Sequence, residues 1–187
     1  TSPETPADAS AASATAPTPE KARVLGMQGK MPVHVEFTSF GYRHGAPAQV
    51  RNGWTYSQPL PVFDCRHLPT VPPYLERQDG LSGAVKRNLM YNPHKDDPSI
   101  PSMKSFAKEV ADEVAPTMIE AINEGGHGYA LPLRMVIHIG SESGRHRAVV
   151  ACELAATALR KILRANKDTQ FKQPCSVGTS HLKAQRR

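Results

Sequence analysis

The feature that constrains the fold most is the stretch from Leu133 to Leu163, LRMVIHIGSESGRHRAVVACELAATALRKIL. Its apolar run from Met135 to Ile139, which only His138 interrupts, is typical of a strand buried on both faces. A small-residue turn, Gly140 to Gly144, follows this run. From Arg145-His146-Arg147 onward, apolar residues recur on one helical face. They are Val150, Leu154, Ala158, Leu159, Ile162 and Leu163. The stretch therefore predicts a strand, a tight turn and a helix N-terminus.

A turn of this kind suits an anion, because its backbone N–H groups lack intrahelical partners and the helix dipole adds partial positive charge. The two arginines and the histidine at the helix start would add charge-assisted donors. The spacing from Ser141 to Arg147 also matches the Cys-x-x-x-x-x-Arg loop of Cys-dependent phosphatases, with serine in place of the nucleophilic cysteine. We therefore expect a loop that binds an anion without cleaving it.

A second interpretation of the same turn stays open. Strand-to-helix turns with a basic first helical turn also serve as structure alone. In addition, Glu142 places a carboxylate inside the loop, and it would repel a phosphate unless its side chain points outward.

Positive charge is concentrated in the last part of the chain. The net charge is +6, and residues 134–187 hold eleven Lys or Arg against three Asp or Glu, so the remainder is slightly acidic. A localised basic field suits nucleic acid, because each neutralised phosphate releases counterions. The alternative is a solvated helix face followed by a frayed tail.

The first part of the chain is too polar to join a core. Residues 1–30 are rich in Ala, Thr, Ser and Pro, and we expect an extended tail there and one domain over residues 31–187. The chain begins at Thr1 rather than Met, so we expect a portion upstream of it. The tail has no arginine before Arg23, unlike a mitochondrial presequence, although it could lie just downstream of one.

Composition narrows the class of protein further. No apolar run approaches the ~20 residues that span a bilayer, so we expect a soluble protein with no membrane partner. Cys65, Cys152 and Cys175 form no C-x-x-C pair, which favours a reducing compartment and a packing role. The eight histidines are scattered, and we expect neither a metal site nor a cofactor.

Other segments complete the expected α/β domain. Strands are predicted at 33–40, 60–65 and 175–180, and helices at 80–91 and 102–123. Asp79 is expected to cap the first of these helices, and Pro116 to kink or split the second. Polar residues follow two strands, His44 after the first and Asp64 and Arg66 at the end of the second; α/β proteins place ligands at such strand ends.

Three segments in the same order resemble one family. FTSFGYRHGAP (37–47), VFDCRHLP (62–69) with DGLSGAV (79–85), and IGSESGRHRAVVACELA (139–155) are similar to the C-terminal domain of the bacterial RapZ family of RNA-binding RNase adaptors. The corresponding stretches in that family run close to SFGFKHGIP, VFDVRFLPNP with TGLD, and IGCTGGKHRSV. The resemblance covers about residues 33–187. Residues 1–187 include no counterpart of the family's N-terminal P-loop domain, and no G-x-x-x-x-G-K-[ST] motif occurs in them.

The resemblance implies a single compact domain with a small mixed or parallel sheet flanked by helices, described in the family as phosphofructokinase-like. It also implies a pocket for an amino-sugar phosphate and a basic surface for RNA. The pocket positions are His44, Arg66, Ser141, Glu142, Ser143, Gly144 and Arg147. The positions expected to contact RNA are Arg145, Lys183, Arg186 and Arg187.

Four positions in or beside the loop depart from the family pattern. Ser141 replaces a cysteine, Glu142 a threonine, Ser143 a glycine and Ala148 a serine. We therefore expect the loop to keep the geometry of the family but to lose affinity for the sugar phosphate. The connection between Pro47 and Leu60 is also longer.

Three functions are compatible with these features. The first is a non-catalytic RNA-binding or structural component of a ribonucleoprotein, such as a mitochondrial ribosome or its assembly intermediates, with neighbouring proteins on the N-terminal tail. This function places the chain in the mitochondrial matrix, or otherwise in the cytoplasm. The second is a sensor or RNase adaptor domain that binds a phosphorylated small molecule. The third, a phosphatase-like enzyme, is the weakest, because Ser141 has no evident base.

Overall fold

A computed structural model describes residues 33–45, 47, 61–91, 101–124, 133–167 and 175–182. In chain order the strands and helices are β1 (Val33–Gly41), β2 (Val62–Asp64), α2 (Gly83–Met90), α3 (Met103–Glu124), β3 (Leu133–Ser141), α4 (Arg147–Ala165) and β4 (Cys175–His181). Two short 3-10 turns, η1 (Tyr42–His44) and η2 (Pro73–Leu75), follow β1 and β2. The predicted tail, residues 1–30, lies outside the described residues.

The described strands form one parallel sheet in the order β2-β3-β1-β4. Because all four run the same way, their carboxyl ends meet at one edge. Gly41 lies opposite Ser141, and Asp64 opposite Gly140, at that edge. The expected α/β class is confirmed. Of the two expected kinds of sheet, mixed or parallel, the described strands form the parallel one.

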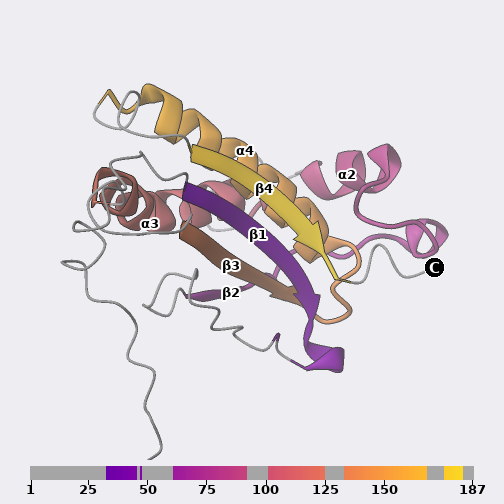
Figure 1. Ribbon diagram of the computed structural model, residues 1–187. Coiled ribbons are helices and arrows are strands. Elements are labelled where there is room, and N and C mark those ends of the chain that lie inside the picture. Colours follow the sequence, from indigo (N-terminus) through magenta and orange to yellow (C-terminus); the bar gives the residue numbers. More distant parts are fainter. Residues whose placement is uncertain are drawn as a thin grey trace, which may run out of the picture.

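Helices α3 and α4 cover one face of this sheet, and α2 packs against both of these helices (Figure 1). Val35 and Phe37 of β1, with Met135 and Ile137 of β3, are fully buried on that face. Alternate residues point to the other face, where Arg134 is exposed and His138 only half-buried. The prediction that β3 is buried on both faces was therefore wrong. In the described part of the chain, helices pack on one side only, and the second face holds polar contacts such as the Arg134–Glu36 ion pair.

Of the two predicted helix details, the cap at Asp79 was wrong, and the second helix is not split at Pro116. Helix α2 begins at Gly83 after Ser82, and Asp79 instead accepts a hydrogen bond from the Leu81 amide at 3.0 Å, so it shapes the preceding turn. Helix α3 runs through Pro116 without a break. It begins after Ser102, whose hydroxyl accepts from the Ser105 amide at 3.1 Å. Buried residues on both sides of the proline, among them Val114 and Met118, hold the helix on the core and offset the lost backbone bond.

No helix among the described residues combines the length and the apolar character needed to cross a bilayer.

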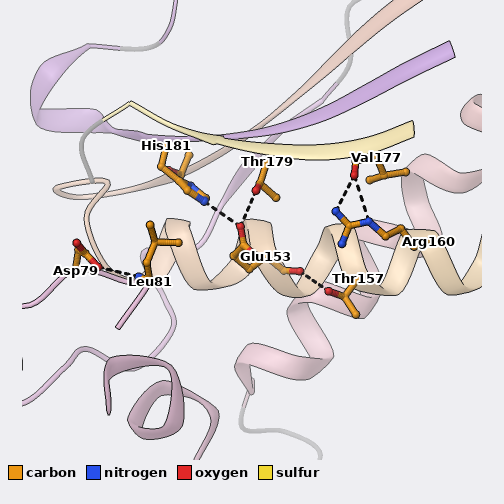
Figure 2. Close-up of polar contacts among 9 residues, drawn as sticks. Asp79, Leu81, Glu153, Thr157, Arg160, Val177, Thr179 and His181 are labelled. Atoms are coloured by element: carbon orange, nitrogen blue, oxygen red, sulfur yellow. Dashed lines mark hydrogen bonds and ion pairs between the residues drawn. The ribbon is translucent and has the colours of Figure 1, made fainter. Parts of the chain in front are cut away.

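Polar contacts fasten the edge strand β4 to α4 (Figure 2). The Glu153 carboxylate accepts from the Thr179 hydroxyl at 2.6 Å and from Nε2 of His181 at 3.1 Å. The other ring nitrogen of His181 lies 2.9 Å from the Ser39 hydroxyl of β1. Two turns further along α4, the Arg160 guanidinium donates to the Val177 carbonyl at 2.7 Å. The last described strand is thus positioned by a carboxylate as well as by the sheet.

The Glu153 contacts predict an acid-sensitive attachment. Burial raises the pKa of Glu153, but the hydrogen bonds from Thr179 and His181 and the charge of Lys86 outweigh it and leave that pKa below its usual value. A lowered carboxyl pKa contributes stability that is present above the unfolded-state pKa, about 4.3, and is lost as the pH falls through the folded-state value. Glu153→Gln should therefore cost about 1 kcal/mol at pH 7 and progressively less below about pH 4.

Urea unfolding of wild type and Glu153→Gln from pH 7 to pH 3 measures this effect. Glu113→Gln is the matched control, because Glu113 is exposed on α3 and has no ion-pair partner among the described residues. A stability difference between wild type and Glu153→Gln that stays constant across the whole pH range would contradict the assignment.

Candidate anion-binding site

The loop between β3 and α4, residues 141–146, packs directly on the end of β1. Gly144 has a positive φ of 70°, and a Cβ there would lie 2.4 Å from the Gly41 nitrogen. Conversely, a Cβ on Gly41 would lie 2.5 Å from the Ser143 carbonyl carbon. Real Cβ atoms do not approach backbone so closely, so this contact requires glycine on both sides.

Internal hydrogen bonds fix the loop but leave several amides free. The buried Ser141 hydroxyl accepts from the Gly144 amide at 3.1 Å, and the Glu142 carbonyl accepts from the Arg43 amide at 3.1 Å. Helix α4 has His146 at its N-cap with no side-chain cap. Among the described residues, the amides of Ser143 and Arg145 have no acceptor either. Donors that can bind an anion therefore remain at the start of α4.

The basic residues of the loop hold a neighbouring segment, residues 66–80, which we call the wall segment. Arg147 Nη1 donates to the carbonyls of Arg66 at 2.5 Å and Leu68 at 2.9 Å. Arg145 Nη2 donates to the Arg77 carbonyl at 2.6 Å, and the His146 ring lies 2.6 Å from the Gln78 carbonyl. These side chains therefore hold the wall segment in place, and the arginines also bring positive charge to the site.

Gly80 closes the far end of the wall segment. Its amide donates to the Arg145 carbonyl at 2.9 Å, and a Cβ there would lie 2.6 Å from Val149 Cβ. The wall segment therefore contacts the loop and the first turn of α4 at its two ends, at 66–68 and at 77–80.

A cleft of about 480 Å³ lies between the loop and the wall segment. Its lining residues are Arg43, Thr70, Val71, Glu76, Ser141, Glu142, Ser143, Arg145, His146 and Arg147. Three arginines face two glutamates, and Glu142 is paired with Arg43 at 2.9 Å. Because this pair neutralises the carboxylate inside the loop, Glu142 opposes an anion less than its position in the sequence indicates.

Each arginine of the cleft uses only part of its guanidinium on the protein. A guanidinium has five N–H donors. Among the described residues, Nε and Nη2 of Arg147 have no acceptor, and the same holds for Nε and Nη1 of Arg145 and for both Nη atoms of Arg43. The remaining donors leave the cleft able to bind phosphate or carboxylate in several orientations.

The structure brings some predicted pocket residues together and separates others. Ser141, Glu142, Ser143 and Arg147 line the cleft, as does Arg145, which was predicted to contact RNA. Gly144 lies in the loop but is buried against β1, His44 is exposed in η1, and Arg66 pairs with Asp64 outside the cleft lining. Lys183, Arg186 and Arg187 lie outside the described residues. The role of all these residues in binding stays a prediction.

Sequence reasoning missed four of the ten lining residues. Arg43 was detectable, because it lies between two glycines at the end of a predicted strand. Thr70, Val71 and Glu76 come from the wall segment, which has no hydrophobic period. Only the fold reveals that this segment faces the loop.

The described residues around Ser141 offer no base to activate it. Its hydroxyl already accepts from an amide, and no histidine or carboxylate is hydrogen-bonded to it among them. The Cys65 thiol lies behind the loop and donates to the Gly140 carbonyl at 3.1 Å. Burial raises its pKa to about 12, although Arg147 acts in the opposite direction, so Cys65 stays a thiol. In the same part of the chain, no three His, Cys, Asp or Glu residues are grouped as metal ligands.

Two comparisons with known proteins bear on this site. The family model for the RapZ C-terminal domain matches residues 33–172, which include the loop, the wall segment and α4. A protein of Rhodospirillum centenum named as a nucleotide-binding protein is 29% identical over 154 residues. The match covers 79% of this chain and 40% of that protein, so the chain spans less than half of its relative's length. The chain belongs to the RapZ C-terminal domain family.

Proposed function

We propose that this chain is a non-catalytic RNA-binding domain in which the cleft beside the β3–α4 loop takes a phosphate group of the RNA. The observation that carries the proposal is the convergence of free amides, the start of α4 and three partly unused arginines on one cleft. This combination suits a phosphate oxygen, which accepts several charge-assisted hydrogen bonds at once.

The charge distribution supports RNA as the source of that phosphate. Residues 134–187 carry an excess of eight positive charges, and this region includes the loop, α4 and the terminal Lys183, Arg186 and Arg187. A polyanion gains from such an extended basic region through counterion release, whereas a single small anion does not. We further propose that the domain works inside a ribonucleoprotein, such as a mitochondrial ribosome or its assembly intermediates in the mitochondrial matrix. There, residues 1–30 would contact neighbouring proteins.

Salt dependence tests the RNA-binding proposal. Replacing Lys183, Arg186 and Arg187 together with alanine should reduce the slope of log affinity against log salt by roughly two to three, because each lost phosphate contact removes about one unit. The matched control replaces Arg87, Lys104 and Lys108 with alanine, because these residues are exposed, lie outside the basic region 134–187 and remove the same net charge. An equal loss of slope in both triple variants would show that only net charge matters and would reject the proposed contacts.

The volume of the cleft favours a second candidate, a phosphorylated small molecule. About 480 Å³ lies within the range of small-ligand sites. Calorimetry with hexosamine phosphates tests this candidate directly, and the absence of heat with the wild-type protein would reject it.

A further inference from the structure

A second polar cluster lies beside the cleft, at the ends of β1 and β2. The Arg66 guanidinium carbon sits 4.3 Å from the centre of the Tyr42 ring, so the cation stacks on the aromatic face. Asp64 holds the same guanidinium from its edge, with Nε 2.9 Å and Nη2 2.7 Å from Oδ2. The Tyr42 ring in turn meets the buried Phe40 edge to face, with 4.8 Å between ring centres.

This arrangement fixes a flat, exposed cation. Asp64 restricts rotation in the plane of the guanidinium, and Tyr42 covers one of its faces. The opposite face has no partner among the described residues, and the Arg66 side chain is 49% exposed. Because Asp64 already offsets its charge, Arg66 is poorly suited to a phosphate. A flat guanidinium that is held in place suits a planar ring, since unpaired bases stack on arginine and aromatic side chains.

The cluster is continuous with the cleft. The Arg66 carbonyl accepts the hydrogen bond from Arg147, so the residue that presents the flat cation also begins the wall segment. Arg66 lies close enough to Glu142 of the loop for their charges to interact. We propose that Arg66, held by Tyr42 and Asp64, is a stacking subsite for an unpaired nucleobase of single-stranded RNA. This inference rests on the proposed function, because a phosphate of the same strand would occupy the cleft.

A matched pair of oligonucleotides tests the stacking subsite. A short single-stranded RNA and an abasic strand of equal length carry the same phosphates, and only the first can stack. Wild type should bind the base-bearing strand about tenfold more tightly than the abasic one. Arg66→Lys keeps the charge but removes the plane, so it should bring the affinity for the base-bearing strand down to the abasic level with an unchanged salt slope.

Controls make the result specific to the stack. Arg164→Lys is the same substitution at the far end of α4 and should leave both affinities as in wild type. Tyr42→Leu removes the supporting ring but not the Arg66–Asp64 pair, and it should lower base discrimination in the same direction. If Arg66→Lys discriminates between the strands as well as wild type, the inference is overturned while the proposed function stands. If wild type binds neither strand, the proposed function itself fails.

Discussion

Replacing Gly144 with alanine is expected to destabilise the protein by about 3 kcal/mol and to abolish phosphate binding in the cleft. The φ of 70° costs a side-chain-bearing residue roughly 1 kcal/mol on its own. The larger part comes from the backbone of β1, because the new Cβ would lie 2.4 Å from the Gly41 nitrogen and 2.5 Å from the Phe40 carbonyl carbon. Neither atom belongs to a flexible side chain, so the loop must move away from the strand.

Gly45→Ala separates the two contributions. Gly45 also has a positive φ, 84°, but a Cβ there would meet no atom within 4 Å. This control should lose about 1 to 2 kcal/mol, because its ψ of 154° with a positive φ is a conformation that glycine alone adopts readily, and it should keep phosphate binding. Thermal and urea unfolding give the stabilities, and phosphate titration gives the binding. An equal loss of stability in Gly144→Ala and Gly45→Ala would mean that the close contact between the loop and β1 does not contribute to stability.

Replacing Arg147 with alanine is expected to cost about 2 kcal/mol and to remove most of the affinity for phosphate. The variant leaves the carbonyls of Arg66 and Leu68 without the donor that pairs with both, and hydrogen bonds to a charged group contribute more than neutral ones. The same change removes two free N–H-bearing atoms, Nε and Nη2, from the cleft. Arg147 should therefore affect stability and binding together.

Arg145→Ala is the comparison for the combined loss of stability and phosphate binding that we expect from Arg147→Ala. Arg145 donates to a single carbonyl of the wall segment, that of Arg77, and its side chain is also part of the cleft lining. We expect it to lose roughly half as much stability as Arg147→Ala while also weakening phosphate binding. Urea unfolding and calorimetry on the same samples provide both numbers. A loss of binding in Arg147→Ala without any loss of stability would contradict the wall-building role.

The fold was largely predictable because the stretch from Leu133 to Leu163 contains two clear hydrophobic patterns. The apolar run before Gly140 and the one-sided stripe on α4 locate a buried strand and its helix. That β3 is buried on one face only was not predictable in this way, because Val136 and Ile139 look alike in the sequence. Only the packing of the helices decides that Ile139 is buried and Val136 half-exposed.

Only the part of the candidate site that comes from consecutive residues, the β3–α4 loop, was predictable. The glycines and the serine of the β3–α4 loop indicate a turn with free amides, and the turn is present. The part played by the wall segment could not be predicted from the sequence. It contacts the loop through backbone carbonyls that accept hydrogen bonds from Arg145 and Arg147, and every residue type has such a carbonyl. His44 and Arg66, assigned to the pocket by resemblance, lie outside the cleft lining, since their side chains follow β1 and β2 rather than the loop.

The most direct test of the central claim is an amide NMR titration of the ¹⁵N-labelled protein with a short single-stranded RNA. The account predicts saturable shifts that are largest at Ser143, Arg145 and Arg147, with the same amides responding more weakly to inorganic phosphate. RNA binding that leaves those three amides unchanged, with shifts confined to other parts of the protein, would contradict it.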